Sequence, residues 1–180
     1  MNPAWSVITF TAVAGAAQGL VVALACAVLG GVPVGRAPGL AMLALAVVLL
    51  AVGLGASFLH LGRPERAWRA MAMWRTSWLS REVVVLPAFM GCVALWWVLV
   101  ASASSVSTPP GGVLGIRVAM PIACIALALL LWLCTAQIYA CLRFIQEWAH
   151  PLTLVNYTLV GLSSGTVLAC AMASAFGESA

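Results

Sequence analysis

The amino-acid sequence predicts an all-α integral membrane protein, a bundle of about five transmembrane helices with a short interfacial helix between the second and the third. The first supporting observation is composition. Hydrophobic residues fill 64% of the 180 positions and charged residues only 7%, with no Lys or Asp. Soluble domains carry about 25% charged residues, so a lipid bilayer is the solvent that suits this chain.

The second observation is that five apolar runs are long enough to cross a hydrocarbon core, which takes about 20 residues. Because the bilayer offers the backbone no water, each run must be a helix. No cationic segment precedes the first run, so we expect a retained helix and not a cleaved signal peptide. Residues 1–180 then form a single transmembrane domain. The runs cover residues 5–29, 40–61, 83–101, 118–142 and 152–176.

Two of these runs carry the spacing of close helix packing. The first contains Gly15 and Gly19, and the fifth contains Gly161 and Gly165. Glycines four residues apart lie on one helix face and let a neighbouring backbone approach closely. The motif fits a dimer interface or packing inside the bundle, and we favour packing because the motif is weakly specific.

Cysteines give no sign of a metal centre. There are six, all inside or at the edges of apolar runs, and no C-x-x-C occurs. We interpret them as small packing residues, and we expect no iron–sulfur cluster in this chain. They are Cys26, Cys92, Cys124, Cys134, Cys141 and Cys170.

The polar residues concentrate in one stretch, from Ser57 to Glu82, which holds five of the eight arginines and three of the eight tryptophans. After Pro64, arginines alternate with apolar residues, which predicts a short helix lying in the membrane interface. The formal charge of +4 does not indicate nucleic-acid binding, because the arginines flank apolar runs as they do at membrane surfaces. A segment that only anchors the bundle at the headgroups is the alternative.

A second polar stretch follows the fourth apolar run. We expect the fourth helix to continue through it until Pro151, with its polar residues on one face because they recur at helical spacing. Counting spans places this stretch and the 57–82 stretch on the same side of the membrane. Such a polar cluster at one end of an apolar bundle predicts the functional site. The residues of the second stretch are Tyr139, Arg143, Gln146, Glu147 and His150.

This cluster suits the oxidation of a quinol, which releases two electrons and two protons. A neutral His60 can accept one proton near neutral pH, and Glu82 can accept a hydrogen bond or carry a proton outward. Arg63 or Arg81 would tune the local field. For His60, a helix-end histidine bonded to a backbone carbonyl is an equally open interpretation.

Two other functions remain open. His60 and His150 could bind a single haem, as in a cytochrome b, but both lie at span boundaries. The chain could also be a membrane docking platform without a redox role. A transporter fits poorly, since transporters place polar groups near the midplane, and here the midplanes are aliphatic.

The polar stretches also carry a family resemblance. The run from His60 to Pro64 (HLGRP), followed by RAW and by SRE ending at Glu82, resembles the membrane anchor subunit of dimethyl sulfoxide reductase, the DmsC family. Residues 139–165 carry a second block of the resemblance. In this family the histidine of the H-L-G motif and the acidic residue opening the next helix lie at the quinol site. The resemblance implies that His60 and Glu82 occupy these positions in this chain.

The resemblance implies an anchor in the bacterial inner membrane that oxidises menaquinol for anaerobic respiration, without haem. The anchor would pass electrons to an iron–sulfur subunit. The iron–sulfur subunit would pass them on to a molybdopterin catalytic subunit. The exposed arginines Arg66, Arg69 and Arg75 would dock the iron–sulfur subunit. The partner subunit would choose the terminal acceptor.

Two features depart from the family pattern. Family members usually have eight spans and this chain has five, so it is a fragment or a shortened member. The positive-inside rule would place the five-arginine connection in the cytoplasm, whereas the resemblance implies a periplasmic face. We follow the resemblance, because arginines covered by a partner need not obey a rule for free loops.

Overall fold

The computed structural model describes residues 5–58, 64–102, 114–142 and 145–177. Five helices in this part are long and apolar enough to cross a membrane, which confirms the predicted fold class. At 1.5 Å per residue, helices of 23 to 27 residues extend about 35 to 40 Å, enough for a hydrocarbon core of about 30 Å. They are α1 (Trp5–Leu29), α2 (Arg36–Phe58), α3 (Trp78–Ser102), α4 (Leu114–Ala140) and α5 (Leu152–Ala175), with a 3₁₀ helix, η1 (Pro64–Met73), before α3.

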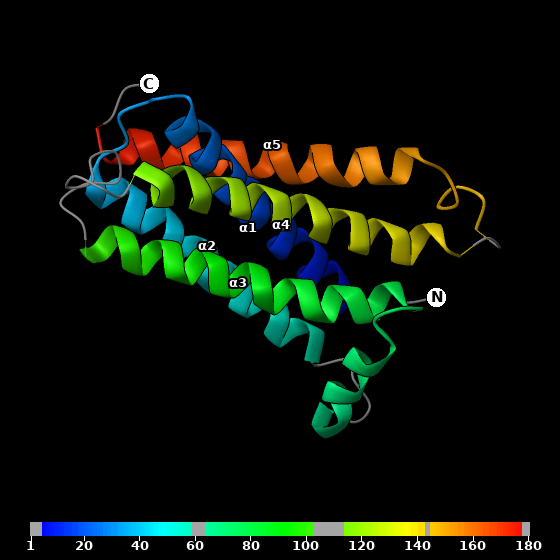
Figure 1. Cartoon of the computed structure of the whole chain (residues 1–180). Coiled ribbons are helices and arrows are strands. Elements are labelled where there is room, and N and C mark those ends of the chain that lie inside the picture. The colour runs from blue at the N-terminus through cyan, green and yellow to red at the C-terminus, as the bar shows by residue number, and fades with distance from the viewer. Residues whose placement is uncertain (1–4, 59–63, 103–113, 143–144, 178–180) are drawn as a thin grey trace.

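The helices run up and down, so successive connections alternate between the two ends of the bundle (Figure 1). Helices α1, α3 and α5 begin at the end where α2 and α4 finish. We call this the η1 end, because η1 also lies there, beside the beginning of α3 (Figure 1). The described parts of the two polar stretches therefore lie at the same end of the molecule, as predicted.

Helix α1 is the centre of the bundle and contacts α2, α4 and α5. Large side chains from the surrounding helices fill the core, including Phe89 of α3 and Trp132 of α4, which are almost completely buried. The thiols of Cys92 and Cys124 lie 3.5 Å apart between α3 and α4 and are free. Helix α5 is peripheral, since only Gly161 and Gly165 along its length are buried.

The two G-x-x-x-G motifs face each other between α1 and α5. A Cβ added at Gly19 would lie 2.7 Å from the carbonyl carbon of Gly161 and would overlap its oxygen. A Cβ at Gly165 would overlap the backbone of Gly19 and Leu20. The glycines thus serve packing inside the bundle, as we favoured, and the two backbones touch where a side chain would separate them.

Three helices begin earlier than predicted. Helix α2 begins at Arg36, whose guanidinium donates a hydrogen bond to the carbonyl of Ala101 at the far end of α3. Helix α3 begins at Trp78, and the Ser77 hydroxyl accepts a hydrogen bond from the Ser80 amide at 3.4 Å, the geometry of an N-cap. Helix α4 likewise begins ahead of its predicted span. Hydropathy marks where a run becomes apolar, whereas α3 begins where the Ser77 hydroxyl caps its first turn.

The prediction that the fourth helix continues to His150 is wrong. Helix α4 ends at Ala140, and the described residues that follow form turns. Leu142 donates its amide to the carbonyl of Tyr139 at 3.0 Å, which tightens the backbone and ends the regular helix. Trp148 then folds back, and its ring meets Tyr139 edge-on with centroids 5.3 Å apart.

We predict that Gly19→Val destabilises the protein by about 3 kcal/mol or more, because the new side chain must push α1 and α5 apart. Gly91→Ala is the control, since no described atom lies within 4 Å of the added Cβ, and we expect no loss of stability and a gain of up to about 1 kcal/mol from helix propensity. The measurement is the unfolding free energy in mixed detergent micelles. Equal stability of both variants would contradict this packing.

Candidate functional site

Glu82 is a charged residue buried within the bundle. It lies in the second turn of α3, and its side chain is 6% exposed. The hydroxyl of Thr135 on α4 donates a hydrogen bond to Oε1 of Glu82. Ionisable groups inside membrane spans are costly and mark functional sites by default, so Glu82 is the first residue of the site.

Thr135 can serve either protonation state of this carboxyl. A hydroxyl has one proton to donate and lone pairs to accept. The Thr135 oxygen lies within hydrogen-bond distance of Oε1 of Glu82 and 3.0 Å from the carbonyl of Leu131. When Glu82 is ionised, Thr135 donates to it; when Glu82 is protonated, Thr135 accepts from it and donates to Leu131. The pair can therefore hold or release a proton without losing its hydrogen bond.

Arg81 points away from this pair, toward the turn between η1 and α3. Its guanidinium donates to the carbonyls of Trp74 and Arg75, at 3.0 and 2.9 Å, and lies 4.2 Å from the ring of Trp78. In the described part of the chain, its hydrogen bonds thus go to backbone carbonyls. They fix the point at which α3 begins, and with it the position of Glu82.

Aromatic residues complete the site. Tyr139 at the end of α4 stacks on Tyr157 near the start of α5, with ring centroids 6.3 Å apart and planes 26° apart. Trp148 closes the other side of Tyr139. Tyr139 lies one helical turn beyond Thr135, the hydrogen-bond partner of Glu82, and Tyr157 stacks on Tyr139. Three helices therefore contribute to one group at the η1 end, the Glu82 cluster, which consists of Glu82, Thr135, Tyr139 and Tyr157.

Several predicted site residues lie outside the described residues. His60, Arg63 and Arg143 are among them, as is the side chain of Arg66. The proposed pairing of His60 with Glu82 therefore stays a prediction. Helix α2 finishes at Phe58, at the η1 end of the bundle.

The other predicted residues are solvent- or lipid-exposed. Glu147 and His150 are exposed in the connection between α4 and α5. Nδ1 of His150 accepts a hydrogen bond from the amide of Leu152 at 3.2 Å, so this imidazole supports the first turn of α5. Arg69 and Arg75 are exposed beside η1, and the Arg69 guanidinium lies 5.6 Å from the ring of Trp68.

Sequence reasoning did not assign Thr135 or Tyr157 to the site. Thr135 precedes Tyr139 by four residues, so the two share a face of α4. That spacing was a usable signal for Thr135. For Tyr157 the sequence offered no comparable signal, because its stacking on Tyr139 depends on how α5 packs against α4.

Comparison with known families agrees with this arrangement. The chain matches the family described as DMSO reductase anchor subunit (DmsC) over residues 1–179. The chain belongs to the DmsC family. It is also similar to a subunit of the sulfite dehydrogenase of Allochromatium vinosum, with 44% identity over 190 aligned positions. That alignment covers 99% of this chain and 57% of the relative, so the chain spans little more than half the relative's length. No solved structure matches.

We predict that Thr135→Val destabilises this DmsC-family protein by about 1 to 3 kcal/mol, because the buried carboxyl of Glu82 loses its donor. Thr135→Ser keeps the hydroxyl and should retain most of the stability. The unfolding free energy of the two variants in detergent provides the measurement. If valine were tolerated as well as serine, the hydrogen bond would not be holding the carboxyl.

Proposed function

We propose that this chain is the membrane anchor of a molybdopterin oxidoreductase complex, and that it exchanges electron pairs with the quinone pool at the η1 end. The observation that carries the proposal is the buried carboxyl of Glu82, held by Thr135 among apolar helices. Such a group is retained at a stability cost, which a proton-handling role explains. Membership of the DmsC family supports the anchor role.

The relative that this chain resembles belongs to a sulfite dehydrogenase, which favours quinone reduction. Sulfite and water yield sulfate, two electrons and two protons in the catalytic subunit. An iron–sulfur subunit would carry the two electrons to the anchor. There one quinone takes up two electrons and two protons and becomes a quinol. Glu82 would deliver one proton and His60 the other, with Thr135 keeping the Glu82 carboxyl hydrogen-bonded before and after.

The family description favours a second candidate, menaquinol oxidation for a sulfoxide reductase. The same site would then run in reverse: menaquinol loses two electrons to the iron–sulfur subunit and two protons to protein groups. Glu82 would accept one of these protons and His60 the other. The two candidates share the anchor role and the site, and they differ in the direction of electron flow.

Partner docking and location complete the proposal. Arg69 and Arg75 are exposed beside η1, and with Arg66 they would orient an iron–sulfur subunit on the η1 end. Docking there places the electron donor or acceptor at the same end as Glu82. The complex would lie in the bacterial inner membrane with this end facing the periplasm.

We predict that Glu82→Gln lowers quinone-linked turnover of the assembled complex at least about a hundredfold, the scale of a lost acid–base group. Activity of the catalytic subunit with a soluble redox dye should be unchanged, because it bypasses the anchor. Glu82→Asp should retain part of the turnover, since the carboxyl remains. Normal quinone turnover in an assembled Glu82→Gln complex would contradict the proposed site.

The direction of electron flow is tested in membranes that contain the native complex. We expect added sulfite to reduce the endogenous quinone pool, measured by extraction and chromatography of quinone and quinol. Deletion of the anchor should abolish this reduction. Quinol oxidation coupled to dimethyl sulfoxide, without any reduction by sulfite, would instead favour the second candidate.

A further inference from the structure

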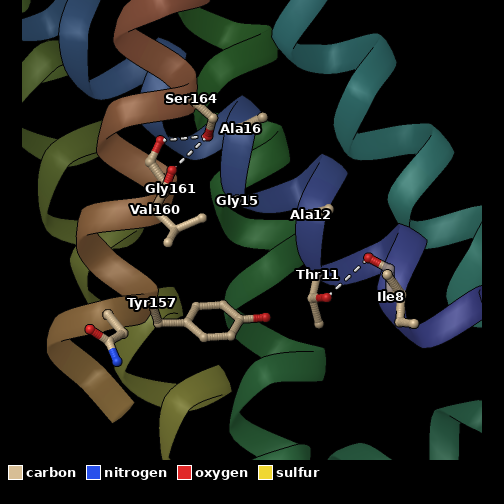
Figure 2. A pocket seen from close by; sticks show the side chains of 10 residues that line it. Ile8, Thr11, Ala12, Gly15, Ala16, Tyr157, Val160, Gly161 and Ser164 are labelled. Atoms are coloured by element: carbon tan, nitrogen blue, oxygen red, sulfur yellow. Dashed lines mark hydrogen bonds between the residues drawn. The ribbon is translucent and has the colours of Figure 1, made fainter. Parts of the chain in front are cut away.

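A pocket of about 290 Å³ lies between the first halves of α1 and α5 (Figure 2). Its lining is largely apolar and comes from both helices, with Ile8, Thr11 and Ala12 on one side and Tyr157, Val160 and Ser164 on the other. Because α1 and α5 both begin at the η1 end, the pocket lies in the half of the bundle that holds the Glu82 cluster.

The pocket exists because the two helices separate from their tight glycine contact. At Gly19 and Gly165 an added Cβ would overlap the opposite backbone, whereas at Gly15 the nearest such atom, the Cα of Gly161, is 4.0 Å away. Gly15 and Ala12 add almost no side chain to fill the widening gap. The pocket therefore lies on the η1 side of the tight glycine contact.

Tyr157 supplies one polar group of this pocket, whose lining also includes Thr11, Asn156 and Ser164. Its hydroxyl points across the space toward Thr11 (Figure 2). The hydroxyl is buried and has no hydrogen-bond partner among the described residues. Thr11 is its polar neighbour: the Thr11 hydroxyl donates to the carbonyl of Ile8 at 3.1 Å, and its oxygen offers Tyr157 only an acceptor outside normal hydrogen-bond geometry. A buried hydroxyl without a partner is costly and calls for an acceptor, which a bound molecule can supply.

The pocket opens toward lipid. Ala12 and Val160 line it and are themselves exposed on the outer surface of two membrane-spanning helices. Its volume is at the lower limit of the about 300 to 1,000 Å³ that small-molecule sites occupy. A pocket of this volume suits a ligand with one or two fused rings, whose long tail would remain in the bilayer.

We propose that this pocket binds the ring of a quinone that enters from the bilayer, with one carbonyl oxygen accepting a hydrogen bond from Tyr157. This inference rests on the proposed function and specifies where the quinone lies. A quinone carbonyl is the acceptor that the Tyr157 hydroxyl lacks, and the flat ring suits a pocket with an aromatic wall. Tyr157 stacks on Tyr139, which lies one helical turn from Thr135, the hydrogen-bond partner of Glu82, so the bound ring would share the η1 end with the proton-handling carboxyl.

The first test measures binding of a short-chain naphthoquinone to the complex purified with its partner subunits. Ala12→Phe fills the pocket and should raise the Kd at least about tenfold. Thr9→Phe adds a ring at a nearby exposed position of α1 that does not line the pocket, and should leave the Kd unchanged. Tyr157→Phe keeps the packing and removes only the hydroxyl, and should raise the Kd about fivefold.

The second test locates the probe directly. An azido derivative of the same naphthoquinone, photolysed in the wild-type complex, should label segments 8–16 and 156–164, and Ala12→Phe should suppress the label. Labelling elsewhere in the complex, or unchanged binding in both Ala12→Phe and Tyr157→Phe, overturns the pocket assignment. If Glu82→Gln still abolishes quinone turnover in that case, the proposed function survives and only the location is wrong. Absence of any binding or label in wild type overturns both.

Discussion

The arrangement of this protein depends on the contact between the backbones of α1 and α5 at Gly19, Gly161 and Gly165. Lipid tails are as apolar as the helices, so burial of apolar surface does not hold two helices together in a bilayer. Close backbone packing replaces it: Gly19 and Gly165 have no side chains to keep α1 and α5 apart, and Gly161 leaves room for the Trp132 ring of α4. Because α5 buries little else, this contact determines where Tyr157 lies and therefore which residues meet at the η1 end.

The second constraint is the absence of water around the polar side chains. Most of the bundle needs no water because its spans are apolar. Several described polar groups near the η1 end form hydrogen bonds within the protein instead. Arg81 bonds turn carbonyls, and Ser77 caps α3. Glu82 is different, since packing alone gives no reason to bury a carboxyl there. Its hydrogen bond to Thr135 makes the burial tolerable.

The sequence predicted the spans and the end at which the polar stretches meet, because the bilayer forces every long apolar run into a helix and alternates the connections. It also singled out Glu82, which the structure buries. It did not predict that α4 ends at Ala140, because the polar residues that follow recur at helical spacing yet form turns. Thr135 and Tyr157 were missed for a related reason. Their roles arise between helices, and spacing within one helix does not reveal which neighbour a side chain meets.

In the proposed function, the carboxyl of Glu82 exchanges a proton when a quinone at the η1 end is reduced or oxidised. Redox-triggered infrared difference spectroscopy of the purified complex tests this exchange directly, because it detects the stretching band of a single buried carboxyl. We predict a carboxyl band that changes with the redox state of the quinone and disappears in Glu82→Gln. A band that persists unchanged in Glu82→Gln, or no carboxyl band in the wild-type complex, would contradict the exchange.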